Sequence, residues 1–151
     1  MKLNFFDKLF GSGFYTGYIS LAPGTFGSFL ALLIYWIPGF EKAVVLIPAI
    51  ILFTFYGIYL GNKFEKIYGK DPSQCTIDEF VGTWISLILV PKTILISGIT
   101  FIVWRLFDII KPFPVKHAEK LEGGAGIMLD DIVAGIYSMI IIHFILLIFK
   151  L

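Results

Sequence analysis

The topology of this chain depends on residues 80–107, FVGTWISLILVPKTILISGITFIVWRLF, which separate the acidic pair Asp78-Glu79 from Asp108. As one continuous membrane span, this stretch would place the acids on opposite faces of a bilayer. As a helical hairpin that turns at Pro91-Lys92, it returns them to the same face. The choice between these two arrangements decides whether the acids can share one site.

The distribution of lysine and arginine favours the hairpin. In that arrangement, nine of the twelve basic residues lie on one side of the membrane, namely Lys2, Lys8, Lys63, Lys66, Lys70, Arg105, Lys111, Lys116 and Lys120. The other three, Lys42, Lys92 and Lys150, lie on the opposite side. Because cytoplasmic loops of membrane proteins carry an excess of Lys and Arg, all the acidic clusters are predicted at the cytoplasmic face.

The composition predicts one integral membrane domain over residues 1–151. The chain is 58% hydrophobic, with a mean hydropathy of +0.88, and only 15% charged. It is thus more apolar and less charged than ordinary globular proteins. Residues 43–60 and 132–149 are clear apolar spans, and residues 26–37 form another if residues 21–25 contribute. The net charge of +1, without a basic stripe, argues against a nucleic acid partner.

The N-terminal segment predicts a short helix that lies on the membrane surface. Its apolar residues fall on one helical face, and its polar residues, Asp7 among them, lie largely opposite. The predicted fold is therefore all-α: a small polytopic helical membrane bundle with an N-terminal interfacial helix and a helical hairpin around Pro91-Lys92.

Five of the eleven acidic residues stand at the edges of apolar runs: Asp78, Glu79, Asp108, Asp130 and Asp131. A carboxylate close to hydrocarbon is costly, so such an acid is by default a functional-site hypothesis. If the three segments converge, they make an oxygen-rich pocket that suits a hard cation such as Mg²⁺. These five residues are the candidate metal ligands.

Basic, hydroxyl and glycine residues near these acids are candidate phosphate ligands. Arg105 and Lys111 can clamp phosphate oxygens, although an i,i+3 salt bridge between Arg105 and Asp108 is the structural alternative. Glycines 123, 124 and 126 are interpreted as a turn whose N–H groups hold an anion, against a flexible loop as the alternative. Thr25 stands near a predicted helix start, where N–H groups can also bind an anion. The candidate phosphate-binding residues are Lys111, Arg105, Thr25, Gly124 and Gly126.

Four segments together resemble the phosphatidylglycerophosphatase A family. They are residues 22–28 (APGTFGS), 78–84 (DEFVGTW), 105–114 (RLFDIIKPFP) and 123–135 (GGAGIMLDDIVAG). They occur in the family's order and spacing, from near residue 11 to the C-terminus. The resemblance implies a Mg²⁺-dependent lipid phosphatase of the bacterial inner membrane. Such an enzyme removes the terminal phosphate of phosphatidylglycerophosphate and leaves phosphatidylglycerol.

The predicted chemistry assigns Asp131, Glu79 and Asp108 as candidate catalytic residues. Asp131 or Glu79 would take the proton of an attacking water, and an aspartyl-phosphate intermediate is the alternative route. From another class of protein, a small cation- or proton-coupled transporter remains an alternative, because membrane acids also mark ion paths. It is disfavoured because no acid stands in the middle of residues 43–60 or 132–149.

Overall fold

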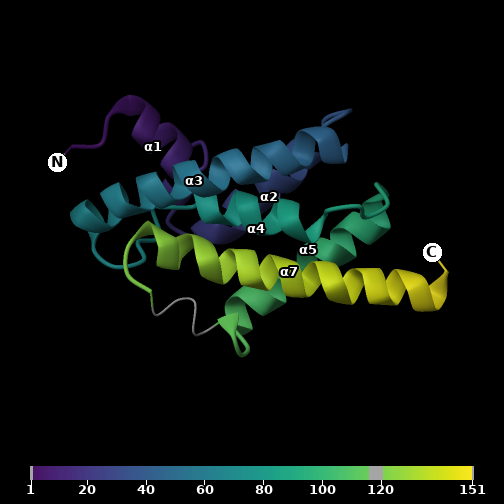
Figure 1. The fold of residues 1–151 in the computed structure, drawn as a ribbon. Coiled ribbons are helices and arrows are strands. Elements are labelled where there is room, and N and C mark those ends of the chain that lie inside the picture. The colour runs from purple at the N-terminus through teal and green to yellow at the C-terminus, as the bar shows by residue number, and fades with distance from the viewer. Residues whose placement is uncertain (1, 116–120, 151) are drawn as a thin grey trace.

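The computed structural model describes residues 2–115 and 121–150, and every regular element in these ranges is helical (Figure 1). The described helices are α1 (Phe5–Gly11), the 3₁₀ turn η1 (Thr16–Tyr18), α2 (Pro23–Tyr35), α3 (Ala43–Tyr68), α4 (Ile77–Ser86), α5 (Ile94–Ile110) and α7 (Gly124–Phe149). The predicted all-α fold is confirmed. Two of the basic residues used in the topology argument, Lys116 and Lys120, lie outside the described residues.

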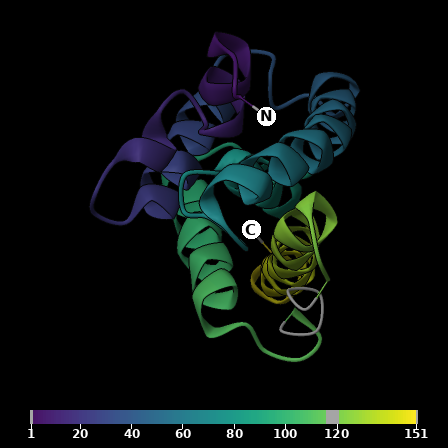
Figure 2. The same cartoon turned by 90° about the vertical axis from the view of Figure 1, so that its left-hand side faces the viewer.

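The short helix α4 lies in the middle of the bundle. All of its residues are buried, and it packs against α2, α3, α5 and α7, which surround it when the bundle is viewed along its length (Figure 2). The indole N–H of Trp84 donates to the carbonyl of Ala31 at 3.0 Å and so fixes α4 to α2. Because α4 begins with Asp78 and Glu79, this central position carries two acids into the bundle.

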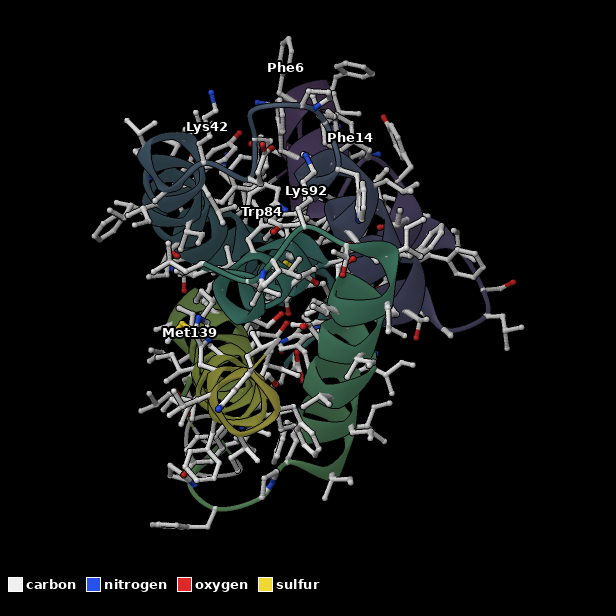
Figure 3. The ribbon with its side chains drawn as sticks, turned by 90° about the vertical axis from the view of Figure 1, so that its right-hand side faces the viewer. Phe6, Phe14, Lys42, Trp84, Lys92 and Met139 are labelled. Carbon is white, nitrogen blue, oxygen red and sulfur yellow. The ribbon has the colours of Figure 1, made fainter. Side chains whose placement is uncertain are left out.

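Helices α4 and α5 form the predicted hairpin, with the turn at residues 87–93. Lys92 in this turn donates to the carboxylate of Glu41 at 2.8 Å, and its ammonium lies 5.8 Å from the ring centre of Tyr35. Figure 3 looks at this end of the bundle, where Lys92 is labelled. The acids that begin α4 and end α5 lie at the opposite end, so the hairpin prediction is confirmed.

Among the helices that the structure describes, α3 and α7 are long and apolar enough to cross a membrane. Only 22% of the most apolar window of each is buried inside the bundle, whereas a core helix of a soluble protein is mostly buried. Large apolar side chains on both helices are exposed, such as Phe55 (70%) and Leu147 (75%). Exposed apolar surface of this extent is typical of contact with lipid, which agrees with a membrane bundle.

Both long helices extend beyond the predicted apolar spans. Helix α7 already begins at Gly124, so the prediction of a glycine turn before the Asp130-Asp131 pair is wrong. The physical reason is the close approach of α3 to α7, because a side chain at Gly61 would collide with Gly124 and one at Gly124 with the carbonyl of Ile58. Asp130 and Asp131 consequently lie in the second turn of α7.

Helix α1 begins with a capping box and packs on α3. The Asn4 side chain accepts from the N–H of Asp7 at 2.7 Å, and Asp7 accepts from the N–H of Asn4 at 3.1 Å. The predicted place of Asp7 on a polar outer face is wrong, because Asp7 is buried and pairs with Lys63 at 2.9 Å. Phe5 and Phe6 are each 62% exposed, as an interfacial helix requires.

We expect the two ends of the bundle to face opposite sides of the membrane. Ser73 lies at the acidic end and Thr93 at the hairpin turn, and both are exposed. In a Cys75→Ser background, an impermeant thiol reagent added to intact cells should label Thr93→Cys and leave Ser73→Cys unlabelled until the cells are permeabilised. Equal labelling of both positions in intact cells would contradict this topology.

Candidate active site

A pocket of about 350 Å³ opens at the acidic end of the bundle. Its walls come from the start of α2, the start of α4, the end of α5, the second turn of α7 and the loop between α3 and α4. All the candidate metal ligands and both candidate cations line it: Asp78, Glu79, Arg105, Asp108, Lys111, Asp130 and Asp131. The hairpin and α7 together bring into one pocket acids that are up to 53 positions apart (131 − 78 = 53).

Arg105 joins three of the four helices that meet at the pocket. Its Nη1 donates to Glu79 Oε2 on α4 at 2.6 Å and to Asp108 Oδ2 on α5 at 2.7 Å. Its Nη2 donates to Thr25 Oγ1 on α2 at 3.4 Å. Glu79 Oε2 also accepts from the hydroxyl of Ser28 at 2.7 Å. The i,i+3 salt bridge expected as the structural alternative is therefore present, and Arg105 uses it to orient two carboxylates.

Lys111 connects the end of α5 to α7. It has a left-handed backbone conformation, with φ of 48°, which ends α5 and turns its side chain toward the pocket. Its ammonium donates to Asp130 Oδ2 at 2.8 Å. Lys111 is less buried than Arg105, with 23% of its side chain exposed against 13%. A flexible ammonium at the open side of the pocket is placed to meet an incoming anion.

Asp78 and Asp131 are the least compensated acids of the pocket. Asp78 Oδ1 and Asp131 Oδ2 are buried and have no hydrogen-bond partner among the described residues. A buried charged oxygen without a partner is costly. The donor set of aspartate and glutamate oxygens is the one that Mg²⁺ prefers, so the residues present fit a divalent cation.

The side chains as they stand do not yet form a closed coordination shell. No group of three or more His, Cys, Asp or Glu side chains in the described ranges is arranged to hold a metal ion. Arg105 and Lys111 instead occupy oxygens of Glu79, Asp108 and Asp130. Asp78 and Asp131 each keep a buried oxygen without a hydrogen-bond partner among the described residues.

Burial changes the titration of the groups at the start of α4. It raises the pKa of Asp78 well above its usual value, and the charge of Glu79 adds to this effect. It raises the pKa of Glu79 to about 7, against the opposing charge of Arg105. A positive charge bound near these crowded acids would stabilise their ionised forms. Burial also raises the pKa of the Cys75 thiol in the pocket wall, which disfavours a thiolate nucleophile.

The remaining predicted phosphate ligands lie outside the pocket wall. Thr25 stands next to it and contacts Arg105, whereas Gly124 and Gly126 serve packing: side chains there would collide with the carbonyls of Ile58 and Leu121. Sequence reasoning missed other parts of the wall, namely Pro23, Gly24, Asp71, Pro72, Ser73, Thr76 and Ile109. The Pro-Gly pair before Thr25 is a sequence signal for this part of the wall. A glycine is needed there because a side chain at Gly24 would collide with the carboxylate of Glu79.

The fold and the pocket define a class: a helical membrane-bundle enzyme with an acid-rich site that also holds two cationic side chains. The chain belongs to the phosphatidylglycerophosphatase A family, which it matches over residues 9–146. It is therefore a phosphatase, and the resemblance seen in its four sequence segments is confirmed.

Three curated relatives are similar over most of this chain. A protein of Bacteroides thetaiotaomicron named putative phosphatidylinositol-3-phosphatase is 41% identical, over 92% of this chain and 92% of its own length. Phosphatidylglycerophosphatase A of Escherichia coli is 34% identical, over 91% of this chain and 81% of its own. Phosphatidylglycerophosphatase A of Haemophilus influenzae is 38% identical, over 89% of this chain and 85% of its own. No solved structure matches the chain.

Proposed function

We propose that this enzyme is a Mg²⁺-dependent lipid phosphatase that hydrolyses the terminal phosphate monoester of phosphatidylglycerophosphate to give phosphatidylglycerol. The observation that carries the proposal is the pocket itself, in which six carboxylates, Asp71 and the five candidate ligands, lie with two cations at one end of an apolar bundle. The names of the Escherichia coli and Haemophilus influenzae relatives support this substrate. The enzyme acts from the cytoplasmic face of the bacterial inner membrane.

The five acids would hold the cation, with Asp78 and Asp131 as its first contacts because each has a buried oxygen without a partner among the described residues. When bound, Mg²⁺ supplies positive charge that stabilises the phosphoryl group in the transition state. A phosphate monoester is a dianion, so an acid-lined pocket needs this charge before the substrate can enter.

The other steps, phosphate binding, positioning of the acids and proton transfer, are assigned to individual side chains of the pocket. The ammonium of Lys111 contacts phosphate oxygens, because it lies at the open side of the pocket and has three donors to share. Arg105 holds Glu79 and Asp108 in place. Asp131 or Glu79 takes the proton of the water that attacks phosphorus. The P–O bond to the glycerol oxygen then breaks, and the leaving oxygen is protonated.

The second candidate substrate is a phosphatidylinositol 3-phosphate. The specific observation in its favour is the name of the Bacteroides thetaiotaomicron relative, which matches 92% of this chain. Both candidates are lipid phosphate monoesters and differ in the polyol of the headgroup. The same charges would therefore serve either one.

Release of inorganic phosphate by the purified enzyme in detergent tests the proposal. We expect release from phosphatidylglycerophosphate with Mg²⁺, little release from a soluble phosphate monoester, and none in excess chelator, with activity restored by added Mg²⁺. A faster release from phosphatidylinositol 3-phosphate would assign the second substrate instead. Undiminished turnover in chelator would remove the metal from the proposal.

A further inference from the structure

One side of the bundle is not sealed by apolar side chains. The described residues form three hydrophobic clusters: one joins α3, α4 and α7, one joins α2, α3 and α4, and the third joins α5 and α7. None of these clusters contains residues of both α2 and α5. The two helices also make few contacts with each other, so the seam between them is loosely packed.

The catalytic pocket meets this seam. Pro23 and Gly24 of α2 line the pocket on one side, and Arg105 and Ile109 of α5 line it on another. At the pocket end of the seam, an exposed hydrogen bond of 3.4 Å from Arg105 to Thr25 joins the two helices. Between this hydrogen bond and the hairpin turn, no further hydrogen bond or ion pair joins the described residues of α2 and α5.

An apolar track on α5 continues from the pocket along the seam. Residues at i, i+4, i+7 and i+11 share one helical face, so Gly98, Ile102 and Ile109 lie on the same face as Arg105. Ile102 is 59% exposed and Ile109 is 67% exposed. A side chain at Gly98 would meet nothing within 4 Å. We call Gly98, Ile102 and Ile109 the acyl track.

The facing side of α2 is also apolar. Its hydrogen bond to Arg105 turns Thr25 toward α5, and Phe29 and Leu32 share the face of Thr25 at i+4 and i+7. Phe29 is 49% exposed. The seam therefore has an apolar wall on each side, with its polar residues at the pocket end.

We propose that the acyl track binds a fatty acyl chain of the lipid substrate, which leaves the pocket between α2 and α5. This inference relies on the proposed lipid phosphatase function. A substrate with its phosphate in the pocket keeps its chains in the bilayer, and the seam is where pocket and lipid-facing surface are continuous. Gly98 lies seven residues before Arg105, about 10 Å along the helix, so the track is long enough to contact several methylene groups.

A bulky residue at Gly98 tests the track. Gly98→Trp fills the open space, and the matched control Ile99→Trp places the same ring on the neighbouring position, about 100° around the helix. The measurement is kcat/KM for dioleoyl and for dihexanoyl phosphatidylglycerophosphate in detergent micelles. A long chain displaced from the track loses packing contacts that the short chain does not make, so we expect a fall of about threefold to tenfold in the long-chain to short-chain ratio for Gly98→Trp. Ile99→Trp should keep the wild-type ratio.

A second pair of variants removes contacts instead of adding bulk. Ile102→Ala should lower the same ratio, and Leu106→Ala, which is exposed on the outer side of α5, should not. Unchanged ratios in Gly98→Trp and Ile102→Ala, or equal changes in the controls, would overturn the acyl track while the enzyme stays active. A wild-type enzyme that releases phosphate from neither lipid would instead overturn the proposed function.

Discussion

Asparagine in place of Asp131 or Asp78 should lower kcat/KM for phosphate release by about 10²–10³-fold. This is the usual loss when one group that stabilises the charge of a transition state is removed. Each residue has a buried carboxylate oxygen with no partner among the described residues. Asparagine keeps the shape of the side chain and removes the charge that a cation needs. Phosphate release at saturating Mg²⁺, and its dependence on Mg²⁺ concentration, measure the effect.

The same two substitutions should leave the protein as stable as before or more stable. A buried, uncompensated carboxylate destabilises a fold, so its neutral analogue removes a cost. We therefore expect an unchanged or higher Tm in detergent together with lost activity. If the acids served only the structure, Asn would lower the Tm and leave the activity of the folded fraction intact.

Glu41→Gln is the matched control for these variants. Glu41 is an acid too, but it has an ion-pair partner, Lys92, and it lies at the hairpin end of the bundle, away from the pocket. Its replacement should leave phosphate release and the Mg²⁺ dependence at wild-type values. A loss of activity in Glu41→Gln equal to that in Asp131→Asn would mean that any acid-to-amide change harms this fold, and the metal assignment would fall.

The hairpin is the part of the fold that the sequence predicted best. Pro91-Lys92 stands between two apolar runs, and acids or basic residues mark the outer ends of both. Periodicity and charge are local signals, so they report which end of a helix faces water. This was enough to place Asp78, Asp108 and Asp130 at one end of the molecule, where the structure brings them to one pocket.

Close packing between distant helices could not be predicted from the same signals. The glycines at residues 123–126 suggested a loop, yet α7 starts among them because Gly124 abuts α3 at Gly61. Likewise, Asp7 suggested an exposed polar face, yet its partner Lys63 stands 56 positions away. A glycine or an acid has the same local pattern in either setting, and only the neighbouring helix decides its role. Paired small residues, such as Gly57 and Gly61 on one helical face, are the signal that points to such contacts.

Loss of the Lys111 side chain should weaken substrate binding and catalysis together. Lys111→Ala is expected to raise KM and lower kcat, with a combined loss of about 10- to 100-fold, as for a hydrogen bond to a charged group. The ammonium is at the open side of the pocket and pairs with Asp130 there. Because the Lys111 backbone is left-handed, Lys111→Gly removes the charge without backbone strain and should show the same kinetic loss with a smaller loss of Tm than Lys111→Ala.

Replacement of Arg105 should act through the acids it holds. Its Nη1 and Nη2 donate to Glu79, Asp108 and Thr25, so Arg105→Ala leaves the buried carboxylate of Glu79 and the partly buried one of Asp108 without their cation. We expect the Mg²⁺ concentration for half activity to rise about 10- to 100-fold, as when the partner of a metal ligand is lost. We also expect a loss of stability of about 3–5 kcal/mol.

Arg105→Lys separates charge from geometry in this role. Lysine restores a positive charge, but its single ammonium lacks the planar fork that reaches Glu79, Asp108 and Thr25 together. Compared with Arg105→Ala, Arg105→Lys should therefore regain most of the lost stability but less of the lost Mg²⁺ affinity, measured as the Mg²⁺ concentration for half activity. If Arg105→Ala raised only the substrate KM while Lys111→Ala had no effect, the two roles would be exchanged, and Arg105 would be the direct phosphate ligand.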